Sequence, residues 1–536
     1  MPNTSSRAFL MSASAALALT AGAVSADTLR IGLASEPTSV DPHYHNLGPN
    51  NALARHIFTP LIEQDAQQLL NPGLATEWEA VDDTTWRLTL REGVTFSNGA
   101  PFTARDVIYT ICRIPLVPDA PSPFTLYTRA IAGLEAEDDH TLIVTTDGPA
   151  PLLPNQLATF GIISASVSGA EDEVSFDTDG CTGIGDAPAS AEFNDPAFAI
   201  GTGPYTLDAY IRGEELRLTR NDNYYGDAPA WEQIVMRPLT NAGARVAALL
   251  AGDVQMIENP PTQDIARIEG DGFVISSGLS NRVIYIALDQ GDAPTPGIAG
   301  DTNPLQDARV REALALAIDR EAIQQRLMLG LSEPAGELLP APMFGTNPDR
   351  PAIPYDAERA RELLADAGYP DGFQIVLGTP NDRYINDGAI SQAVAQMWTQ
   401  VGVQTEVDAK TFSAFIADRN GFNFSAFLAG WGAGTGEMSS PLGALVATRD
   451  PDRSLGGTNF ARHSNPDIDD RLVEALQTVD DAERERLLRE ASAIAMDTFA
   501  IVPIHYELTT WALAPGLEYE ARADQYTLGF AVTQAD

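Results

Sequence analysis

The chain has 536 residues, with 74 acidic and 33 basic side chains, and its formal net charge at pH 7 is −41. A nucleic-acid or anionic-membrane binder needs a basic surface that displaces counterions, so this balance argues against both classes of partner. Hydrophobic residues make up 44% of the chain and charged residues 20%. That composition is typical of a globular protein with two or three domains and a solubilising acidic surface.

The first 26 residues have the pattern of a secretory signal peptide. Arg7 precedes an apolar run over residues 8–24, and this run ends in Val24-Ser-Ala26, a site of the kind that a signal peptidase cleaves. We expect residues 1–26 to be removed and the mature chain to begin at Asp27. The run is too short and too rich in Ala and Ser for a membrane span, and no cysteine near the cleavage point could carry a lipid. The sequence therefore predicts a periplasmic protein that is not a lipoprotein.

Strands and helices alternate along the first half of the mature chain without a repeat. Residues 28–33 predict a strand that breaks at Glu36-Pro37, and residues 86–90 alternate apolar with polar side chains, as a half-buried strand does. Residues 166–196 are rich in Asp, Gly, Ser and Ala without periodicity, which predicts a long surface loop. This half is therefore predicted to be mixed α/β.

Helical periodicity is clear in the second half. Apolar residues recur at helical spacing behind Asp307, which is placed as an N-cap, and along a second helix that is expected to start at Asp356 and stop at Gly368. Two further helices are expected around residues 472–479 and 487–494. Asp480 and Glu483 have the spacing of a capping box and precede the second of these helices.

Cys112 and Cys181 are the two cysteines of the chain, and both lie in the exported part. In an oxidising compartment they either pair or stay isolated thiols. Because Cys181 lies in the predicted loop, which nothing else anchors, we predict that the two form a disulfide. Two thiolates with no histidine at ligand spacing would leave a zinc ion half coordinated, so a zinc site is excluded there.

The motifs of common enzyme classes are missing from the sequence. It has no G-x-S-x-G elbow and no H-E-x-x-H, and Lys410, its one lysine, is not part of a P-loop. The glycine-rich run 432–436 lacks the spacing of a dinucleotide-binding loop and fits a tight loop beside a ligand better. His43 and His45 could ligate a metal as a pair, although ordinary loop histidines are the better interpretation. We expect no catalysis, no cofactor and no metal.

Several stretches form a set of recognisable sequence blocks. Residues 86–107 read WRLTLREGVTFSNGAPFTARDV, and further blocks lie at residues 36–42, 201–205, 221–225, 307–319 and 367–373. In content and order these blocks resemble the bacterial extracellular solute-binding proteins of family 5, the peptide, nickel and opine receptors of ABC importers. The resemblance covers essentially the whole mature chain. It implies an α/β class II periplasmic binding protein fold, with two lobes, a hinge and an extra domain inserted in the first lobe.

The domain boundaries follow from this resemblance. It implies a lobe I of residues 27–58, 196–283 and 505–536, an extra domain of residues 59–195, and a lobe II of residues 284–504. Independently, the short apolar runs 283–288 and 501–505 lie between helical regions and are predicted to be the buried strands that cross between the lobes. Such a hinge has two stable arrangements, and a ligand that contacts both lobes would favour the closed one.

In the peptide receptors that the chain resembles, an Arg beside a Tyr meets the ligand carboxylate. Arg383 and Tyr384 stand at that position, ahead of Val401-Gly-Val403. A guanidinium suits this task, since it binds a carboxylate through two parallel hydrogen bonds and stays charged when desolvated. The alternatives are that Arg383 pairs with an acidic neighbour and that Tyr384 is a core or rim aromatic.

The dipeptide receptors of the family bind the ligand ammonium with an Asp three residues after the Trp of a Gly-Trp segment. Here Trp431 follows Gly430, and we expect it to form a wall of the cleft, with core packing as the alternative. The matching position, however, is Gly434, and the first acid is Glu437. Either Glu437 reaches in from the glycine-rich loop to bind a cationic group, or the ligand has no free α-amine there.

We therefore predict a periplasmic substrate-binding protein of an ABC importer. It would capture a small peptide or amino-acid-like conjugate between its lobes and deliver it to a permease at the inner membrane, as a monomer and without nucleic acid. An exported hydrolase or chaperone-like protein on the same fold is the other hypothesis. The missing nucleophile motif argues against it.

Overall fold

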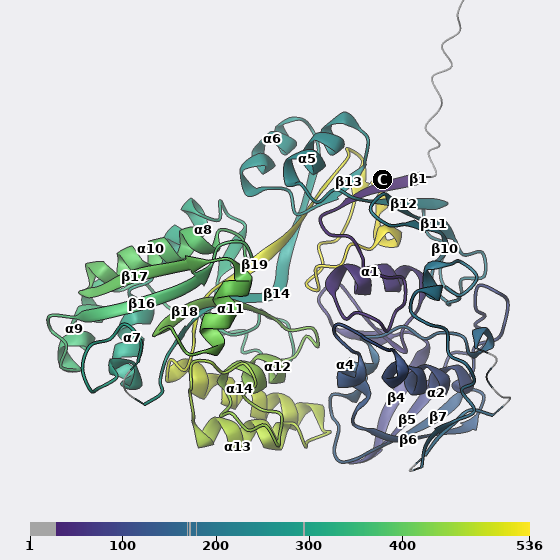
Figure 1. The fold of residues 1–536 in the computed structure, drawn as a ribbon, viewed down its shortest axis with the longest axis horizontal. Helices are drawn as coiled ribbons and strands as arrows, with labels where there is room; N and C mark the ends of the chain where they lie inside the picture. The colour runs from purple at the N-terminus through teal and green to yellow at the C-terminus, as the bar shows by residue number, and fades with distance from the viewer. Residues whose placement is uncertain (1–27, 169, 171–172, 178, 293–294, 536) are drawn as a thin grey trace, which may run out of the picture.

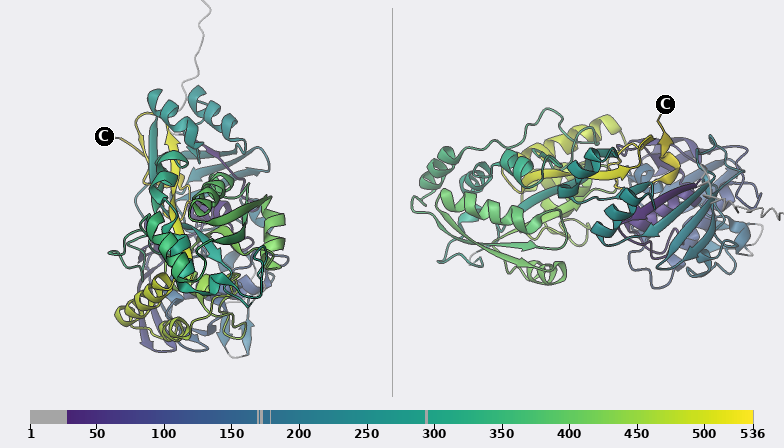
Figure 2. Two further views of the ribbon diagram at one scale, coloured as in Figure 1. Left: turned by 90° about the vertical axis from the view of Figure 1, so that its left-hand side faces the viewer. Right: turned by 90° about the horizontal axis from the view of Figure 1, so that it is seen from above.

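The computed structural model describes residues 28–168, 170, 173–177, 179–292 and 295–535. The expected signal peptide lies outside the described residues. Two bodies lie side by side, joined by two long strands (Figure 1), and the view from above shows the same elongated, two-part shape (Figure 2). None of the helices within the described ranges has the length and hydropathy needed to cross a bilayer.

Lobe I contains one half of a mixed sheet. Its central strand β1 (Thr28–Leu33) is parallel to both β12 (Gln233–Pro238) and β13 (Met256–Glu258). Five of the six residues of β1 are buried, because a central parallel strand is covered on both faces. The other elements of this lobe are α1 (Gly48–Ile57), β10 (Tyr205–Ile211), β11 (Glu215–Arg220), α5 (Ala242–Ala251) and α6 (Ile265–Gly270).

The extra domain lies below lobe I in Figure 1 and has its own antiparallel sheet, in the order β4-β5-β7-β6-β8-β9. One continuous apolar core runs from lobe I into this domain, so the two form a single body. Its elements are β2 (Ile62–Gln64), β3 (Leu70–Pro72), β4 (Ala75–Asp82), β5 (Thr85–Leu90), α2 (Ala104–Arg113), α3 (Thr125–Thr128), β6 (Ile131–Asp138), β7 (Thr141–Thr146), α4 (Leu153–Leu157), β8 (Ser175–Asp177) and β9 (Gly180–Thr182).

The prediction of an unstructured loop over residues 166–196 was wrong in part. Strands β8 and β9 form a hairpin within it, and Phe176 of β8 pairs with Leu134 of β6. These strands have three residues each. Strands this short carry no alternation that a sequence pattern could reveal.

Lobe II contains the other half of the large sheet, covered by helices on both faces, with a separate apolar core on each face. The expected caps Asp307 and Asp480 are present, and Asp356 also caps its helix: each side chain accepts a hydrogen bond from a backbone N–H group of its helix. The elements are α7 (Ala308–Leu316), α8 (Arg320–Arg326), β15 (Ser332–Pro334), α9 (Ala357–Asp366), β16 (Phe373–Pro380), α10 (Asp387–Gln400), β17 (Val403–Lys410), α11 (Phe412–Asn420), β18 (Ala426–Gly432), α12 (Ser439–Pro441), α13 (Pro466–Ala475) and α14 (Asp481–Asp497).

Two strands connect the lobes, at the places where the sequence predicts crossing strands. They are β14 (Val274–Leu288) and β19 (Val502–Leu513), both longer than the apolar runs that predicted them. They pair antiparallel with each other from Val274↔Leu513 to Ile286↔Val502. Through this pair the sheet continues from β13 in lobe I to β18 in lobe II. After β19 the chain returns to lobe I and ends in the short strands β20 (Leu517–Glu518) and β21 (Thr533–Gln534).

His43 is buried next to an ion pair that ties the N-terminal segment to α2. The Arg113 guanidinium donates to both carboxylate oxygens of Asp41, each at 2.7 Å, and contacts His43 Nδ1 at 3.0 Å. Burial of the imidazole and the neighbouring Arg113 charge lower the pKa of His43 to about 4. His43 is therefore a neutral part of the core, and among the described residues no group of three His, Cys, Asp or Glu side chains is arranged for a metal ion.

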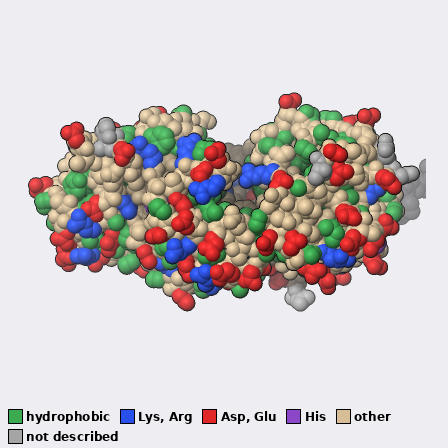
Figure 3. Space-filling model, turned by 90° about the horizontal axis from the view of Figure 1, so that it is seen from below, with side chains coloured by type: hydrophobic (Ala, Val, Ile, Leu, Met, Phe, Trp, Pro, Cys, Tyr) green, Lys and Arg blue, Asp and Glu red, His purple; other side chains and the backbone are tan. Residues whose placement is uncertain are grey.

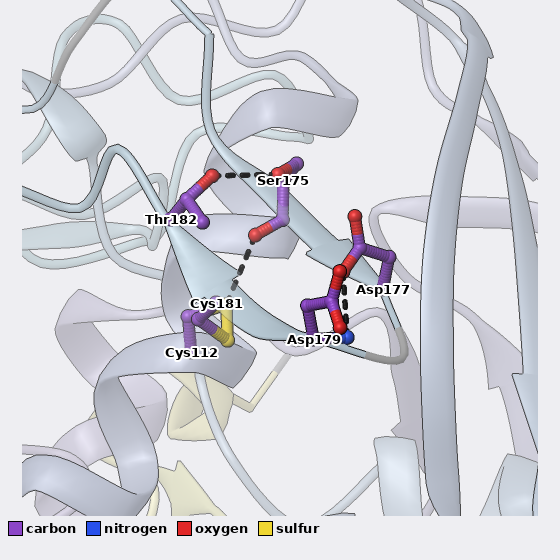
Figure 4. Close-up of a disulfide and its surroundings, with 6 residues drawn as sticks. All are labelled: Cys112, Ser175, Asp177, Asp179, Cys181 and Thr182. Atoms are coloured by element: carbon purple, nitrogen blue, oxygen red, sulfur yellow. Dashed lines mark hydrogen bonds between the residues drawn. A yellow bond between two sulfur atoms is a disulfide. The ribbon is translucent and has the colours of Figure 1, made fainter.

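The structure joins Cys112, near the end of α2, to Cys181 of β9 through a disulfide (Figure 4). Ser175 Oγ and Thr182 Oγ1 are hydrogen-bonded across the β8–β9 hairpin at 2.7 Å. The disulfide closes a loop between cysteines 69 positions apart. It therefore anchors a hairpin that has few apolar residues of its own.

We predict that this disulfide is present in the purified protein and stabilises it by about 4 kcal/mol, the entropy loss expected for closing a loop of this length in the unfolded chain. Thiol labelling of denatured, unreduced protein should modify no cysteine. The double variant C112S/C181S should unfold at a lower urea concentration. Labelling of both cysteines in the unreduced protein would contradict the prediction.

Candidate ligand-binding cleft

Two adjoining cavities lie where the two bodies meet the crossing strands, with volumes of about 520 and 290 Å³. Both are lined by residues of lobe I, lobe II and the crossing strands. They share four lining residues, Asn259, Arg282, Thr509 and Gln525. Because the cavities adjoin, we treat them as one cleft with a larger and a smaller part.

A β-bulge in β14 forms part of the cleft wall. Leu279 pairs with Leu508 and Val283 pairs with Tyr506, so residues 280–282 of β14 lie opposite the single residue Glu507 of β19. A bulge bends a strand and redirects its side chains, and bulges are frequent beside binding sites. Here it directs Arg282 into both parts of the cleft.

Arg282 and Glu507 form an ion pair across the two crossing strands. Arg282 Nε lies 3.4 Å from Glu507 Oε2, and the side chains are 21% and 8% exposed. Glu507 Oε1 accepts a hydrogen bond from the backbone N–H of Ile385 at 3.2 Å, which connects β19 to the loop of residues 382–386 in lobe II. Burial raises the pKa of Glu507, although the nearby Arg282 and Arg383 charges oppose the shift.

Arg383 lines the larger part of the cleft, on the loop between β16 and α10. The Asp387 carboxylate accepts hydrogen bonds from the N–H groups of Arg383 and Tyr384, at 3.1 and 3.0 Å, and so holds the loop. The exposed Arg383 guanidinium lies 5.3 Å from the Phe412 ring and 5.7 Å from the Tyr384 ring. Among the described residues it makes no ion pair, so the expected alternative, a pair with an acidic neighbour, is not what the structure has.

Tyr384 lines the same part of the cleft. Its hydroxyl donates to the carbonyl of Gly430 at 3.3 Å. Its ring lies so close to the backbone of β18 that a Cβ at Gly430 would be 2.8 Å from the ring. The glycine before Trp431 therefore makes room for the tyrosine that accompanies Arg383.

Trp431 is half-buried and packs against one of the lobe II cores, and its indole N–H donates to Ser440 Oγ at 3.2 Å. Its neighbours Gly432 and Gly434, rather than the indole, line the smaller part of the cleft. The core-packing alternative thus describes the indole better than the expected cleft wall.

Glu437 does not reach into the cleft, which corrects the expectation that it is available for a cationic ligand group. Its side chain is 1% exposed, and its carboxylate lies 2.5 Å from Arg484 of α14. The Arg484 guanidinium also lies over the Phe344 ring at 4.4 Å. Burial raises the pKa of Glu437, and the Arg484 charge opposes that shift. A buried carboxylate needs such a partner, which the glycine-rich loop spacing could not reveal.

The glycine-rich loop instead contacts the extra domain. The side-chain amide of Gln68 donates to the Gly434 carbonyl at 3.1 Å, and that of Asn155 donates to the Thr435 carbonyl at 2.9 Å. Asn281 of the bulge joins the same contact by donating to Gln68 Oε1 at 2.9 Å. A loop with few side chains exposes its carbonyls, and here they connect the two bodies beside the hinge.

Two charged residues of the cleft, Arg282 and Glu507, were missed from the sequence. Each stands next to a predicted crossing strand: Arg282 immediately precedes the run 283–288, and Glu507 follows the run 501–505 two residues on. A charged side chain at the end of a buried crossing strand has to lie near the gap between the lobes. That position was the signal that could have identified both.

Two lobes, a hinge of two crossing strands and a cleft between the lobes define a class II periplasmic binding protein fold. The model of the bacterial extracellular solute-binding proteins, family 5 (middle part), matches residues 70–452, and the chain belongs to this family. The predicted family and fold class are thereby confirmed. Members of the family are substrate-binding proteins of ABC transporters and not enzymes.

Individual relatives agree with this assignment. The chain is 28% identical over 498 residues to the glutathione-binding protein GsiB of Escherichia coli K12, covering 90% of each chain. The structure of HbpA2 from Haemophilus parasuis superimposes with a TM-score of 0.80 at 22% identity, over 95% of this chain and 99% of that one. The structure of DppA from Helicobacter pylori, in complex with the peptide STSA, superimposes with a TM-score of 0.70 at 20% identity. The match covers 95% of this chain and 98% of that one.

Because the Glu437–Arg484 pair lies in the core and outside the cleft, we predict that changing it alters the stability of the protein but not its affinity for ligand. R484M should lower the free energy of unfolding by about 3–5 kcal/mol, because it leaves a buried carboxylate without its partner. The matched double variant E437Q/R484M should recover part of that loss. E437Q alone should bind ligand as the wild type does, measured by calorimetry beside urea melts. If E437Q lost ligand affinity while its urea unfolding curve stayed unchanged, Glu437 would have to contact the ligand and this prediction would be wrong.

Proposed function

We propose that the chain is exported behind a cleaved signal peptide and captures a small peptide or amino-acid-like conjugate in the periplasm. It then delivers this ligand to an ABC permease at the inner membrane. The observation that carries the ligand class is Arg383, whose exposed guanidinium lines the larger part of the cleft without an ion pair among the described residues. A fork of unpaired N–H donors in a cleft suits a carboxylate. The names of the relatives, a glutathione-binding protein and a peptide complex, support the same class.

Closure of the hinge would transmit the binding event. Lobe I contributes residues 259–263 to the larger part of the cleft, and lobe II contributes residues 382–386. A ligand that contacts both groups has more interactions in a closed arrangement than in an open one, so it shifts the population toward closure. The permease then responds to the closed shape of a monomeric receptor.

For the division of the chain we propose the boundaries expected from the sequence. They are lobe I at 27–58, 196–283 and 505–536, the extra domain at 59–195 and lobe II at 284–504. The junctions at 283/284 and 504/505 fall inside β14 and β19, the two strands that cross. This supports a hinge located in these strands.

Native mass spectrometry of freshly purified protein tests the proposal directly. A receptor should carry a co-purified peptide or conjugate and return it chemically unchanged after incubation with peptide mixtures. Conversion of the added peptides would support the hydrolase hypothesis instead. Protein that carries no ligand and binds none from the mixtures would contradict the proposed ligand class.

We predict that R383A weakens binding of a carboxylate-bearing ligand by about 2–5 kcal/mol, the range for truncating one member of a desolvated, hydrogen-bonded charge pair. R383K should also lose affinity, because an ammonium cannot reproduce the two-pronged contact of a guanidinium. Calorimetric titration with the co-purified ligand measures both effects, and melting curves serve as the folding control. Unchanged affinity in R383A would place the carboxylate elsewhere in the cleft.

A further inference from the structure

The cleft presents two guanidinium groups to a ligand although the protein as a whole is strongly acidic. Arg383 lines the larger part, and Arg282 lines both parts. The formal net charge of the chain is −41. Figure 3, which views the molecule from below, shows Lys and Arg side chains on both sides of the hollow between the bodies, with Asp and Glu side chains next to them and over the rest of that face.

We propose that Arg282 is a second anion-binding group and that the ligand of this cleft carries two carboxylates, one for Arg383 and one for Arg282. This inference rests on the proposed function, because it refines the class of peptide or conjugate that the cleft selects. Arg282 lies on the hinge strand itself, so a ligand held there contacts the element about which the lobes close.

The Arg282 guanidinium has N–H donors that are not used by other residues described in the structure. A guanidinium carries five N–H groups. Arg282 directs Nε toward Glu507 at 3.4 Å and one Nη2 hydrogen toward Gln525 Oε1 at 3.4 Å, both long for charge-assisted bonds. The remaining donors have no partner within the described part of the chain. Its guanidinium lies near Gly432, where an added Cβ would be 3.6 Å from Nη2, so no side chain covers it from that strand.

The carboxylates that line the smaller part of the cleft already have strong donors. Glu258 accepts hydrogen bonds from the backbone N–H of Ala34 at 2.6 Å and from the Thr527 hydroxyl at 2.5 Å. Asp524 is held by the Arg522 guanidinium at 2.6 Å. Both carboxylates therefore already accept hydrogen bonds, Asp524 from a guanidinium and Glu258 from two neutral donors.

The glycine-rich loop also provides no acidic side chain for a ligand ammonium. Gly432 and Gly434 line the smaller part of the cleft without a side chain, and Glu437 is paired with Arg484 in the core. Arg282, which is positive, lies beside this loop, because a Cβ added at Gly432 would be 3.6 Å from its Nη2. A free ammonium placed beside Gly432 would face this guanidinium, whereas a carboxylate there would find its donors.

Matched peptide pairs test this inference on the wild-type protein. Each pair differs by a single carboxylate replaced with its amide: glutathione and its glycinamide, Gly-Glu and Gly-Gln, Gly-Asp and Gly-Asn. For the pairs that bind, we expect the acid member to bind at least tenfold more tightly by calorimetry. R282Q should abolish this preference, so that the acid and amide members bind with equal affinity, with R383K as the matched variant that weakens both members and keeps the preference.

The outcomes separate this inference from the proposed function. If no member of any pair binds and the peptide mixtures yield no bound ligand either, the proposed function fails and this inference fails with it. If the ligand bound from the mixtures has fewer than two carboxylates, the receptor assignment stands and this inference is wrong. If peptides bind but acid and amide members bind equally, the receptor assignment stands and the two-carboxylate inference is wrong. The inference is also wrong if R282Q weakens both members of a pair alike. Melting curves of each variant exclude misfolding, and the wild-type comparison does not depend on any variant.

Discussion

The pairing of β14 with β19 is the interaction on which the rest of the structure depends. A chain that crosses between two lobes has to satisfy its backbone N–H and C=O groups outside the sheet of either lobe, and these two strands do so by bonding to each other. Their pairing carries one sheet through both bodies. It is interrupted by the bulge at residues 280–282, which turns Arg282 into the cleft opposite Glu507. One backbone constraint therefore joins the lobes, defines the hinge and positions charged groups of the site.

The distribution of charge follows from burial. Acidic side chains can be numerous on the surface, because water solvates them. Several buried carboxylates have a guanidinium partner: Arg113 for Asp41, Arg484 for Glu437 and Arg282 for Glu507. Arg383 differs from these, since it lies exposed in the cleft over aromatic rings. An exposed arginine that lines the cleft and makes no ion pair with any described residue indicates a place for an anionic ligand.

Local patterns predicted the local structure well, because caps and strand ends depend on neighbours in the sequence. The caps Asp307 and Asp480 and the two crossing strands are examples. Ion pairs and strand registers between residues far apart in the sequence could not be predicted from such patterns. Glu437 is neutralised by Arg484, 47 positions away, and Arg282 enters the cleft through a bulge that only the register of β14 on β19 produces. Helix α13 also ends at Ala475, before the expected Val479.

The central claim is that the two bodies close about β14 and β19 when a ligand contacts both. Distance measurement by pulsed electron paramagnetic resonance tests it, with spin labels at V81C in the extra domain and E358C in lobe II, two exposed positions, while both native cysteines stay in their disulfide. At saturating ligand, verified by calorimetry, the distance distribution should become shorter and narrower. Distributions that superimpose with and without bound ligand would contradict the hinge account.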